Sequence, residues 1–325
     1  MQGLKNLGST CAINSLVQII CRNKFLRCSI LNEDVAENTL AYELKELLKI
    51  LHIEKSSVSP NKFINAVYNY IKELNEGEQI DITELWFLLN DKLISELNII
   101  SKKIEYNKEF ENIKLNSELI HDKVAYTINC FNNNKTCEWL CKSQGVILNT
   151  VECNKCKNMS YNFEPFNSIQ LDLPNSSEPK SLTALFRNYL KSTVSKDEWK
   201  CEKCKECTEY TKSLKLWKMP NVLIFLIKRY TNNIKKNNLK VDINQNINIK
   251  KGCILMDTNL EKKYHLTSIG MHIGNLDNGH YIAICKDDDT EKFILYDDLN
   301  IKVFNKDNIG FLSKNSEAYM VVYNT

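Results

Sequence analysis

Four of the thirteen cysteines stand in two Cys-x-x-Cys pairs, a spacing that is typical of a metal site. The pairs are Cys153 with Cys156 and Cys201 with Cys204. Each pair can turn two thiolates to one side, and four thiolates suit a tetrahedral Zn²⁺ ion. Because four protein ligands leave no position for a reacting water, we expect this zinc to be structural. The alternative is four ordinary reduced cysteines. Cys207 lies three residues beyond Cys204 and could compete as a ligand, but we expect it to be a bystander.

Another cysteine, Cys11, lies where the sequence predicts the start of a helix. Apolar residues follow it at helical spacing, and Ser9 and Thr10 are residue types that cap helix N-termini. Unpaired N–H groups and the helix dipole favour negative charge in a first turn. A thiol in this place is expected to lose its proton more easily, and the thiolate is the nucleophilic form. The alternative is that Cys11 is a small buried hydrophobic residue.

A nucleophilic thiol needs a base, and the chain offers five histidines. His280 follows a turn signal, Asp-Asn-Gly, and opens an apolar strand, so that its side chain can project into a cleft. The next predicted strand ends at Asp297 and Asp298, and a hairpin would bring Asp297 beside His280. An acceptor there would hold one ring nitrogen and leave the other facing the thiol. Paired aspartates at strand ends are also common turn formers. Helical or strand contexts favour structural roles for His52, His265 and His272, and His121 lies in the unassigned region, which offers no context.

The elements that must position these residues are helices in the first hundred residues and strands after residue 145. Besides the helix at Cys11, we expect helices over 40–51, from Ser59-Pro60, and from Asp81 with Glu84 completing a capping box. A short helix is expected over 181–190. Residues 101–145 carry no clear pattern, and 231–251 are expected to form a mobile loop with a weak strand. Helices followed by strands indicate an α+β fold. The expected strands cover 146–148, 161–173, 222–227, 264–271, 280–285, 293–296 and 318–323.

Composition argues against several classes of protein. The formal net charge is only +3, so no nucleic-acid-binding or membrane-binding surface is expected. No apolar run approaches the length of a membrane span, and the N-terminus lacks a signal-peptide pattern. An odd number of cysteines in a long chain indicates reduced thiols, and therefore a cytoplasmic or nuclear location.

Several stretches together resemble the ubiquitin-specific proteases, a family of papain-like cysteine deubiquitinases built as thumb, palm and fingers. Residues 3–18 resemble the cysteine box, Gly-Leu-x-Asn-x-Gly-x-Thr-Cys-x-x-Asn-Ser-x-x-Gln. Residues 264–281 and 296–298 are similar to the histidine box, and 79–85 to the Gln-Gln-Asp box. Residues 199–230 resemble the segment that joins the finger zinc site to the palm, and 318–323 the closing Ala-Tyr-x-Leu-x-Tyr. The match is ordered and spans the whole chain.

The resemblance implies a single catalytic domain over 1–325, with a mainly helical thumb (1–130), mainly fingers (145–215) and a mainly β-sheet palm (216–325). It implies a monomer that hydrolyses the bond after the C-terminal glycine of ubiquitin through a thioester, with ubiquitin and ubiquitinated proteins as partners. Cys11 would be the nucleophile, His280 the base and Asp297 the residue that orients it. Asn6 would help form the oxyanion hole. The two cysteine pairs would hold the structural zinc of the fingers, and substrate would contact Gly279, Tyr281, Asp81 and Glu84.

The sequence departs from the family pattern without losing a catalytic group. Ala12 replaces the usual aromatic residue, Ile80 replaces the second glutamine, Thr211 replaces a common alanine, and the usual Phe-Pro pair after Tyr230 is missing. Substrate choice and rate are therefore open. The alternatives are action on another ubiquitin-like modifier and a catalytically weak module that only captures ubiquitin. A zinc-dependent nucleic-acid binder is disfavoured by the near-neutral charge.

Overall fold

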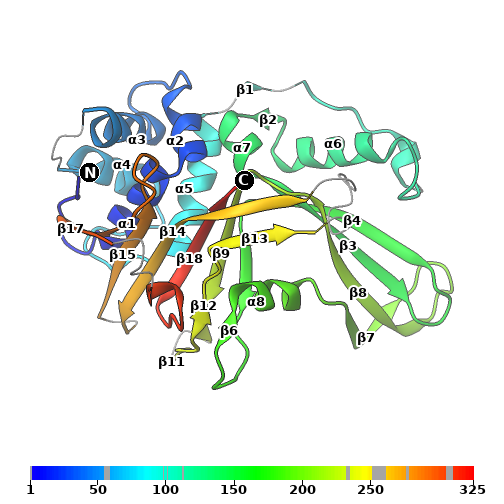
Figure 1. Ribbon diagram of the computed structural model, residues 1–325. Coiled ribbons are helices and arrows are strands. Elements are labelled where there is room, and N and C mark those ends of the chain that lie inside the picture. The colour runs from blue at the N-terminus through cyan, green and yellow to red at the C-terminus, as the bar shows by residue number, and fades with distance from the viewer. Residues whose placement is uncertain are drawn as a thin grey trace.

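The computed structural model describes residues 2–54, 59–97, 99–100, 102–111, 113–231, 235–250, 261–275, 278–304 and 310–325. Helices dominate the first part of the chain and strands the rest (Figure 1), which confirms the α+β class. Among these residues, no helix is both long and apolar enough to cross a lipid bilayer.

The N-terminal helices form one layer that covers one face of the main sheet (Figure 1). The predicted helices are present, with α4 beginning at Asn61 and Pro60 at its N-cap position, one residue later than expected. A further helix, α2, follows α1 directly. The helical elements of this layer are α1 (Cys11–Arg22), α2 (Lys24–Leu31), α3 (Leu40–Lys49), the π-helical turn η1 (Ile50–Glu54), α4 (Asn61–Tyr70) and α5 (Ile82–Glu96).

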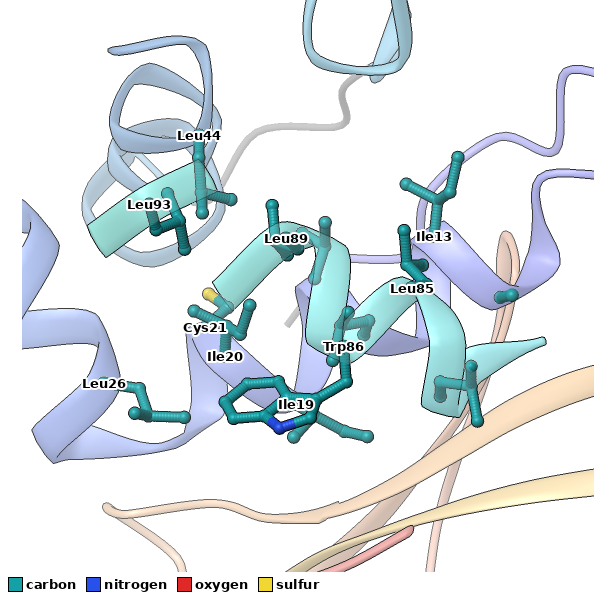
Figure 2. Close-up of a cluster of buried hydrophobic side chains, with 14 of the residues drawn as sticks. Ile13, Ile19, Ile20, Cys21, Leu26, Leu44, Leu85, Trp86, Leu89 and Leu93 are labelled. Carbon is teal, nitrogen blue, oxygen red and sulfur yellow. The ribbon is translucent and has the colours of Figure 1, made fainter. Parts of the chain in front are cut away.

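Helix α1 is the centre of this layer, and every one of its residues is buried. On one side Ile13, Ile19 and Ile20 pack in the same cluster as Leu85 and Trp86 of α5 (Figure 2). On the other side it lies against the strands of the main sheet. A helix enclosed on all sides cannot slide or tilt without opening the core, so its first residue, Cys11, has a fixed place.

The main sheet has the strand order β17-β16-β15-β14-β18-β9-β5, and β13 also pairs with β14. Among the described strand pairs of this sheet, β5 and β9 are parallel and the others are antiparallel. Strand β9 is the expected fully buried strand: Val222, Ile224 and Leu226 face the helices, and the alternate residues face α8 on the opposite side. The strands are β5 (Ile169–Asp172), β9 (Val222–Lys228), β13 (Asn246–Ile249), β14 (Lys262–Gly274), β15 (Gly279–Lys286), β16 (Phe293–Asp297), β17 (Asn300–Val303) and β18 (Ala318–Asn324).

A second sheet, with the order β4-β3-β8-β7, projects away from the helical layer (Figure 1). It consists of β3 (Gly145–Cys153), β4 (Met159–Phe166), β7 (Thr193–Lys200) and β8 (Cys207–Lys218). Helix α6 (Ile120–Phe131) packs on it through Ile120 and Val124, which meet Phe163 and Trp217. Because β3 and β8 pair along their length, they bring the turns after β3 and β7 to the same end of the sheet.

Two regions that the sequence left without a clear assignment hold ordered elements. Residues 101–145 contain η2 (Lys108–Glu111), α6, β2 (Lys135–Thr136), which pairs with β1 (Ile99–Ile100), and α7 (Glu138–Ser143). Within 231–251, β11 (Lys235–Lys236) pairs with β10 (Tyr230–Thr231), and β12 (Val241–Asp242) pairs with β6 (Lys180–Ser181). Residues 232–234 and 251 of the predicted loop lie outside the described residues. The remaining elements are the predicted short helix α8 (Leu182–Tyr189), which Ser181 caps, and η3 (Gly310–Leu312).

Candidate active site

The segment before α1 is fixed by the side chain of Asn6. Its Oδ1 accepts hydrogen bonds from the backbone N–H of Gly8 at 3.0 Å and from the hydroxyl of Thr10 at 3.1 Å. Gly8 and Ser9 have φ values of 104° and 52°, so two successive left-handed residues turn the chain sharply into the helix. Thr10 occupies the N-cap position but makes no side-chain cap, because its hydroxyl bonds Asn6 and the N–H of Leu7. The expected capping interaction is therefore replaced by a bond to Asn6.

Cys11 is the first residue of α1, as predicted, and only 7% of its surface is exposed. Burial raises the pKa of the Cys11 thiol, and the carboxylate of Asp298 raises it further. Backbone N–H groups of Tyr281, Ala12 and Cys11 itself act in the opposite direction without overcoming burial. The expectation of an acidified thiol is thus wrong for this state, since desolvation outweighs the helix N-terminus. The influence of Tyr281 places the sulfur against the start of β15.

His280 opens β15 and meets the end of β16 across the β15–β16 hairpin. Its Nε2 lies 2.7 Å from Oδ1 of Asp297 and 3.9 Å from Oδ2 of Asp298. The side chains of His280 and Asp297 are 39% and 40% exposed, so solvent reaches this edge of the site. Within the described part of the chain, Nδ1 of His280 has no hydrogen-bond partner. The sequence-predicted Cys11, His280 and Asp297 therefore gather at one place in the fold.

Asp298 links the two ends of the chain. Its Oδ1 accepts a hydrogen bond from Nδ2 of Asn14 at 2.7 Å, and its Oδ2 accepts one from Nδ2 of Asn6 at 2.9 Å. Its carbonyl oxygen accepts from the N–H of Leu4 at 2.9 Å. Gly3 allows this contact, since a Cβ there would lie 2.5 Å from the same oxygen. Asp298 and Asn14 were not predicted site residues, because only the folded hairpin brings them together.

The segment before α5 runs alongside the start of β15. Asp81 caps α5 by accepting from the N–H of Thr83 at 2.7 Å, and its Oδ2 accepts from the hydroxyl of Tyr281 at 3.2 Å. Gln79 forms a pair of bonds with the backbone of Gly279, donating to its carbonyl at 3.2 Å and accepting from its N–H at 3.4 Å. Glu84, by contrast, is exposed. Gln79, the first residue of the segment that resembles the Gln-Gln-Asp box but not a predicted site residue, therefore fixes the residue before His280.

The four paired cysteines come together at the far end of the second sheet. The sulfur atoms of Cys153 and Cys204 lie 4.0 Å apart, and those of Cys156 and Cys201 lie 3.6 Å apart. A tetrahedral zinc site with Zn–S bonds of about 2.3 Å has sulfur atoms about 3.8 Å apart. The backbone N–H of Cys156 lowers the pKa of Cys153 to about 6, whereas the N–H of Glu206 at Cys204 is outweighed by burial and the neighbouring cysteines, which raise the pKa of Cys204 to about 11. The donor set and its spacing fit Zn²⁺, and Cys207 is not part of the cluster.

A comparison with protein families gives one match across almost all of the chain. The family model described as "Ubiquitin carboxyl-terminal hydrolase" matches residues 2–323. This chain belongs to the ubiquitin carboxyl-terminal hydrolase family. The match begins before the cysteine segment and ends within β18, so it includes both the thiol and the histidine ends of the site.

Two relatives in this family have low sequence identity to this chain, but the similarity extends over most of its length. It is 25% identical over 315 residues to ubiquitin carboxyl-terminal hydrolase Usp2 of Drosophila melanogaster, covering 91% of this chain and 32% of the relative. It is 23% identical over 336 residues to ubiquitin carboxyl-terminal hydrolase 4 of Arabidopsis thaliana, covering 98% of this chain and 89% of the relative. The chain thus spans about a third of the fly protein and most of the plant protein.

The fold is similar to that of a solved structure of the SAGA Ubp8/Sgf11/Sus1/Sgf73 DUB module bound to ubiquitin aldehyde. The TM-score is 0.75 at 20% identity, with 100% of this chain and 69% of that chain covered. A structure of the same module bound to monoubiquitin matches with a TM-score of 0.74. These likenesses confirm the predicted fold of this hydrolase-family chain: a helical thumb, a β-sheet palm and β fingers that end in a cysteine cluster.

Proposed function

We propose that this protein is a cysteine-type deubiquitinase, which hydrolyses the isopeptide or peptide bond after the C-terminal glycine of ubiquitin. The observation that carries the proposal is the position of Cys11, at the first turn of a fixed helix and against the strand that begins at Gly279 and His280. The family match over residues 2–323 supports ubiquitin as the substrate. The single-domain division into thumb, fingers and palm at about 130, 145 and 215 is part of the same proposal.

In the proposed mechanism, His280 removes the proton of Cys11 and the thiolate attacks the carbonyl carbon of the terminal glycine. Asp297 binds Nε2, which leaves Nδ1 as the nitrogen that exchanges the proton. Collapse of the tetrahedral intermediate breaks the C–N bond, and the imidazolium gives its proton to the leaving amine. A water molecule deprotonated by His280 then attacks the thioester, releasing ubiquitin with a free carboxylate and returning the proton to the thiolate.

The raised pKa of Cys11 makes the base necessary in this mechanism. A thiol whose pKa lies above its ordinary value is protonated at neutral pH, so it must lose its proton to His280 when substrate is in place. Asn6 is proposed to stabilise the oxyanion through its side-chain amide. Donors of this kind stabilise charge that develops in the transition state, and losing one typically lowers kcat by about 10²–10³.

The proposed substrate contacts lie beside the nucleophile and on the start of α5. Gly279 and Tyr281 would line the channel for the paired glycines that end ubiquitin, because the backbone of Tyr281 lies at the sulfur. Exposed Glu84 is free to meet a basic side chain, whereas Asp81 is already bonded to Tyr281. Ubiquitin and ubiquitinated proteins would be the partners of a monomeric enzyme in the cytoplasm or nucleus.

The four finger cysteines are proposed to hold a structural Zn²⁺ ion. Cys153 and Cys156 follow β3, and Cys201 and Cys204 follow β7, so one ion would join the two turns at the end of the sheet. Zinc bound there would cross-link the two turns and stabilise the end of the sheet, and it would take no part in the chemistry at Cys11.

The central experiment compares Cys11→Ala with Cys28→Ala, a control at a half-buried cysteine of α2. With ubiquitin carrying a fluorescent C-terminal amide as substrate, Cys11→Ala is expected to lose all turnover, to keep ubiquitin binding and to retain its melting temperature. Cys28→Ala is expected to turn over within twofold of the unchanged protein. Turnover by Cys11→Ala would remove the mechanism. Ubiquitin binding without any turnover by the unchanged protein would favour the capture module.

A second experiment tests substrate identity. Ubiquitin and several ubiquitin-like proteins, each carrying a C-terminal electrophile, are mixed in turn with the protein, and adducts at Cys11 are located by mass spectrometry. Ubiquitin is expected to react fastest. Preferential reaction with another modifier would keep the thiol chemistry and replace the substrate.

A further inference from the structure

The ammonium group of Lys236 binds the C-terminal end of β14, which pairs with the start of β15 at Gly279 and His280. It lies on β11, which pairs with β10 in the register Tyr230↔Lys236. Its Nζ donates to the carbonyl oxygen of His272 at 2.7 Å and to that of Gly274 at 2.9 Å, and it lies 3.4 Å from Nδ1 of His272. The two carbonyl oxygens take two of the three N–H bonds of the ammonium group, and the third can go to Nδ1 of His272 when that nitrogen carries no proton.

No carboxylate lies within ion-pair distance of this ammonium in the described part of the chain. Glu317 and Arg229 act on it only from farther away, and with opposite signs. The ammonium also lies 5.9 Å from the ring centroid of Tyr319. A cation that is partly withdrawn from water and bonded to backbone carbonyls is a structural tie rather than a solvated surface charge. Its neighbour Lys235 is exposed and makes no such contact among the described residues.

The bonds of Lys236 fall on the residues that pair with the start of β15. In the β14–β15 ladder, His272 lies opposite Tyr281, Ile273 opposite His280, and Gly274 opposite Gly279. The two carbonyl groups that Lys236 binds therefore flank Ile273, the residue that pairs with His280, the proposed base. Because the two strands are joined by hydrogen bonds, a shift of the end of β14 would also shift the start of β15.

The ring of His272 extends this tie to Gly279. It packs against the ring of Tyr281 at a tilt of 39°, with ring centroids 4.6 Å apart. It also fills the space beside Gly279, where a Cβ would lie only 1.8 Å from Nε2 of His272. From the other side, Gln79 bonds both backbone groups of Gly279. The backbone next to His280 is thus held between Gln79 and the Lys236–His272 pair.

We propose that Lys236 is a positioning residue for the reaction. Its ammonium holds the end of β14 and the ring of His272 where they set the backbone of Gly279, and through it the direction of the His280 imidazole. Lys236 touches none of the reacting atoms. The inference rests on the proposed function, and it adds that the β10–β11 hairpin controls how well the base meets the thiol. A displacement of about 1 Å at a reacting group can lower the rate about 100-fold.

The test uses Lys236→Met, which keeps an unbranched side chain up to the Cε position and removes its donors, with Lys235→Met as the matched control. On the ubiquitin C-terminal amide reporter, Lys236→Met is expected to lower kcat by about 10- to 100-fold while KM changes by less than about threefold. Lys235→Met is expected to stay within twofold in both constants. Lys236→Arg, which restores donors, is expected to recover part of kcat. A rise in KM with unchanged kcat, or equal losses at both lysines, would overturn the inference.

A second readout is independent of ubiquitin. The rate at which iodoacetamide alkylates Cys11 is followed by mass spectrometry across pH, because it reports thiolate formation assisted by His280. The midpoint of this profile is expected to move to higher pH in Lys236→Met and to stay in place in Lys235→Met. If the reporter is not cleaved at all but this shift is present, the proposed function fails and the positioning role stands. If the profile does not move, the positioning role fails.

Folding is measured on every variant by thermal denaturation. If Lys236→Met is unfolded at 25 °C, Lys236→Gln, which keeps one donor group, takes its place in both assays. It is expected to show the same direction of change in kcat and in the alkylation midpoint. A folded Lys236→Gln variant with unchanged kcat and an unchanged midpoint would contradict the inference.

Discussion

Replacing His272 by glutamine should remove the loss of unfolding free energy that His272 causes between about pH 6.5 and pH 4. The ring of His272 is 4% exposed, and burial together with the nearby Lys236 ammonium lowers its pKa from 6.5 to about 4. Asp81 acts in the opposite direction and His280 in the same direction as Lys236. Tyr230, Tyr281 and Tyr319 enclose the rest of the ring. The native protein therefore keeps this histidine neutral where an unfolded chain would protonate it.

The sign of the effect follows from which state binds the proton. Between pH 4 and 6.5 the unfolded chain takes up a proton at this residue and the native protein does not, so stability falls as the pH falls. Each tenfold difference in proton affinity is worth about 1.4 kcal/mol, so the full effect is roughly 3 kcal/mol below pH 4. At pH 5 about 2 kcal/mol of it is present. Above pH 7 it vanishes, because both states are neutral.

The assay is urea unfolding of the unchanged protein and of His272→Gln at pH 7.5, 6 and 5. Glutamine offers an oxygen to Lys236 but does not titrate. The difference in unfolding free energy between the two proteins is expected to change by about 2 kcal/mol from pH 7.5 to 5, with His272→Gln gaining relative stability in acid. Protonation of carboxylates and zinc ligands is common to both proteins and cancels. A difference that stays constant within about 0.5 kcal/mol would refute the reasoning.

Four other perturbations have definite expected outcomes. Asp297→Asn should lower kcat on the ubiquitin reporter by about 10²–10⁴ with little change in KM, since it weakens the acceptor at Nε2 of His280, and an unchanged kcat would argue against the pairing. Gly279→Ala should lower kcat at least tenfold, because its Cβ would lie 1.8 Å from His272, whereas Gly77→Ala, at an open turn, should not. Arg229→Met should cost about 3–5 kcal/mol in urea unfolding, because the buried guanidinium donates to four backbone carbonyls, and a loss below 1 kcal/mol would contradict that role. Removal of zinc with a chelator should lower the melting temperature and release one ion per chain by metal analysis, and release of none would exclude the proposed site.

The hydrophobic pattern of α1 predicted some features of this helix correctly and gave no information about others. The spacing from Ile13 to Cys21 predicted a helix with one buried face and Cys11 in its first turn, and both features are present. The pattern carries no information about the opposite face, which is buried as well. Its polar residues bond the N-terminal segment: Gln18 donates to the carbonyl of Gln2 at 2.8 Å, and Asn14 to Asp298. Hydrophobicity alone does not distinguish a polar side chain that meets water from one that meets backbone.

The parts of the site that the sequence did not reveal depend on contacts between distant segments. Asn6 and Asp298 are 292 residues apart, and Gln79 and Gly279 are 200 apart. Local periodicity carries no information about such pairs. Helix α6 was missed for a different reason, since its apolar contacts to the second sheet come from only a few residues, Ile120 and Val124 among them. A narrow apolar face leaves a weak periodic signal.

The hydrogen bonds of Asn6 determine how its side-chain amide would bind an oxyanion. The oxygen of its amide accepts from Gly8 and from both donors of Thr10, and these bonds fix the plane and the orientation of the group. One hydrogen of Nδ2 is used by Asp298, so the direction of the second hydrogen is set as well. A donor that is already oriented does not have to be reorganised when negative charge develops, and this is the condition under which such a group accelerates a reaction most. The same bonds tie the cysteine segment to the turn that carries Asp297. The donor proposed for the oxyanion and the acceptor proposed for the histidine are therefore held in one network, and a change to either should be felt by the other.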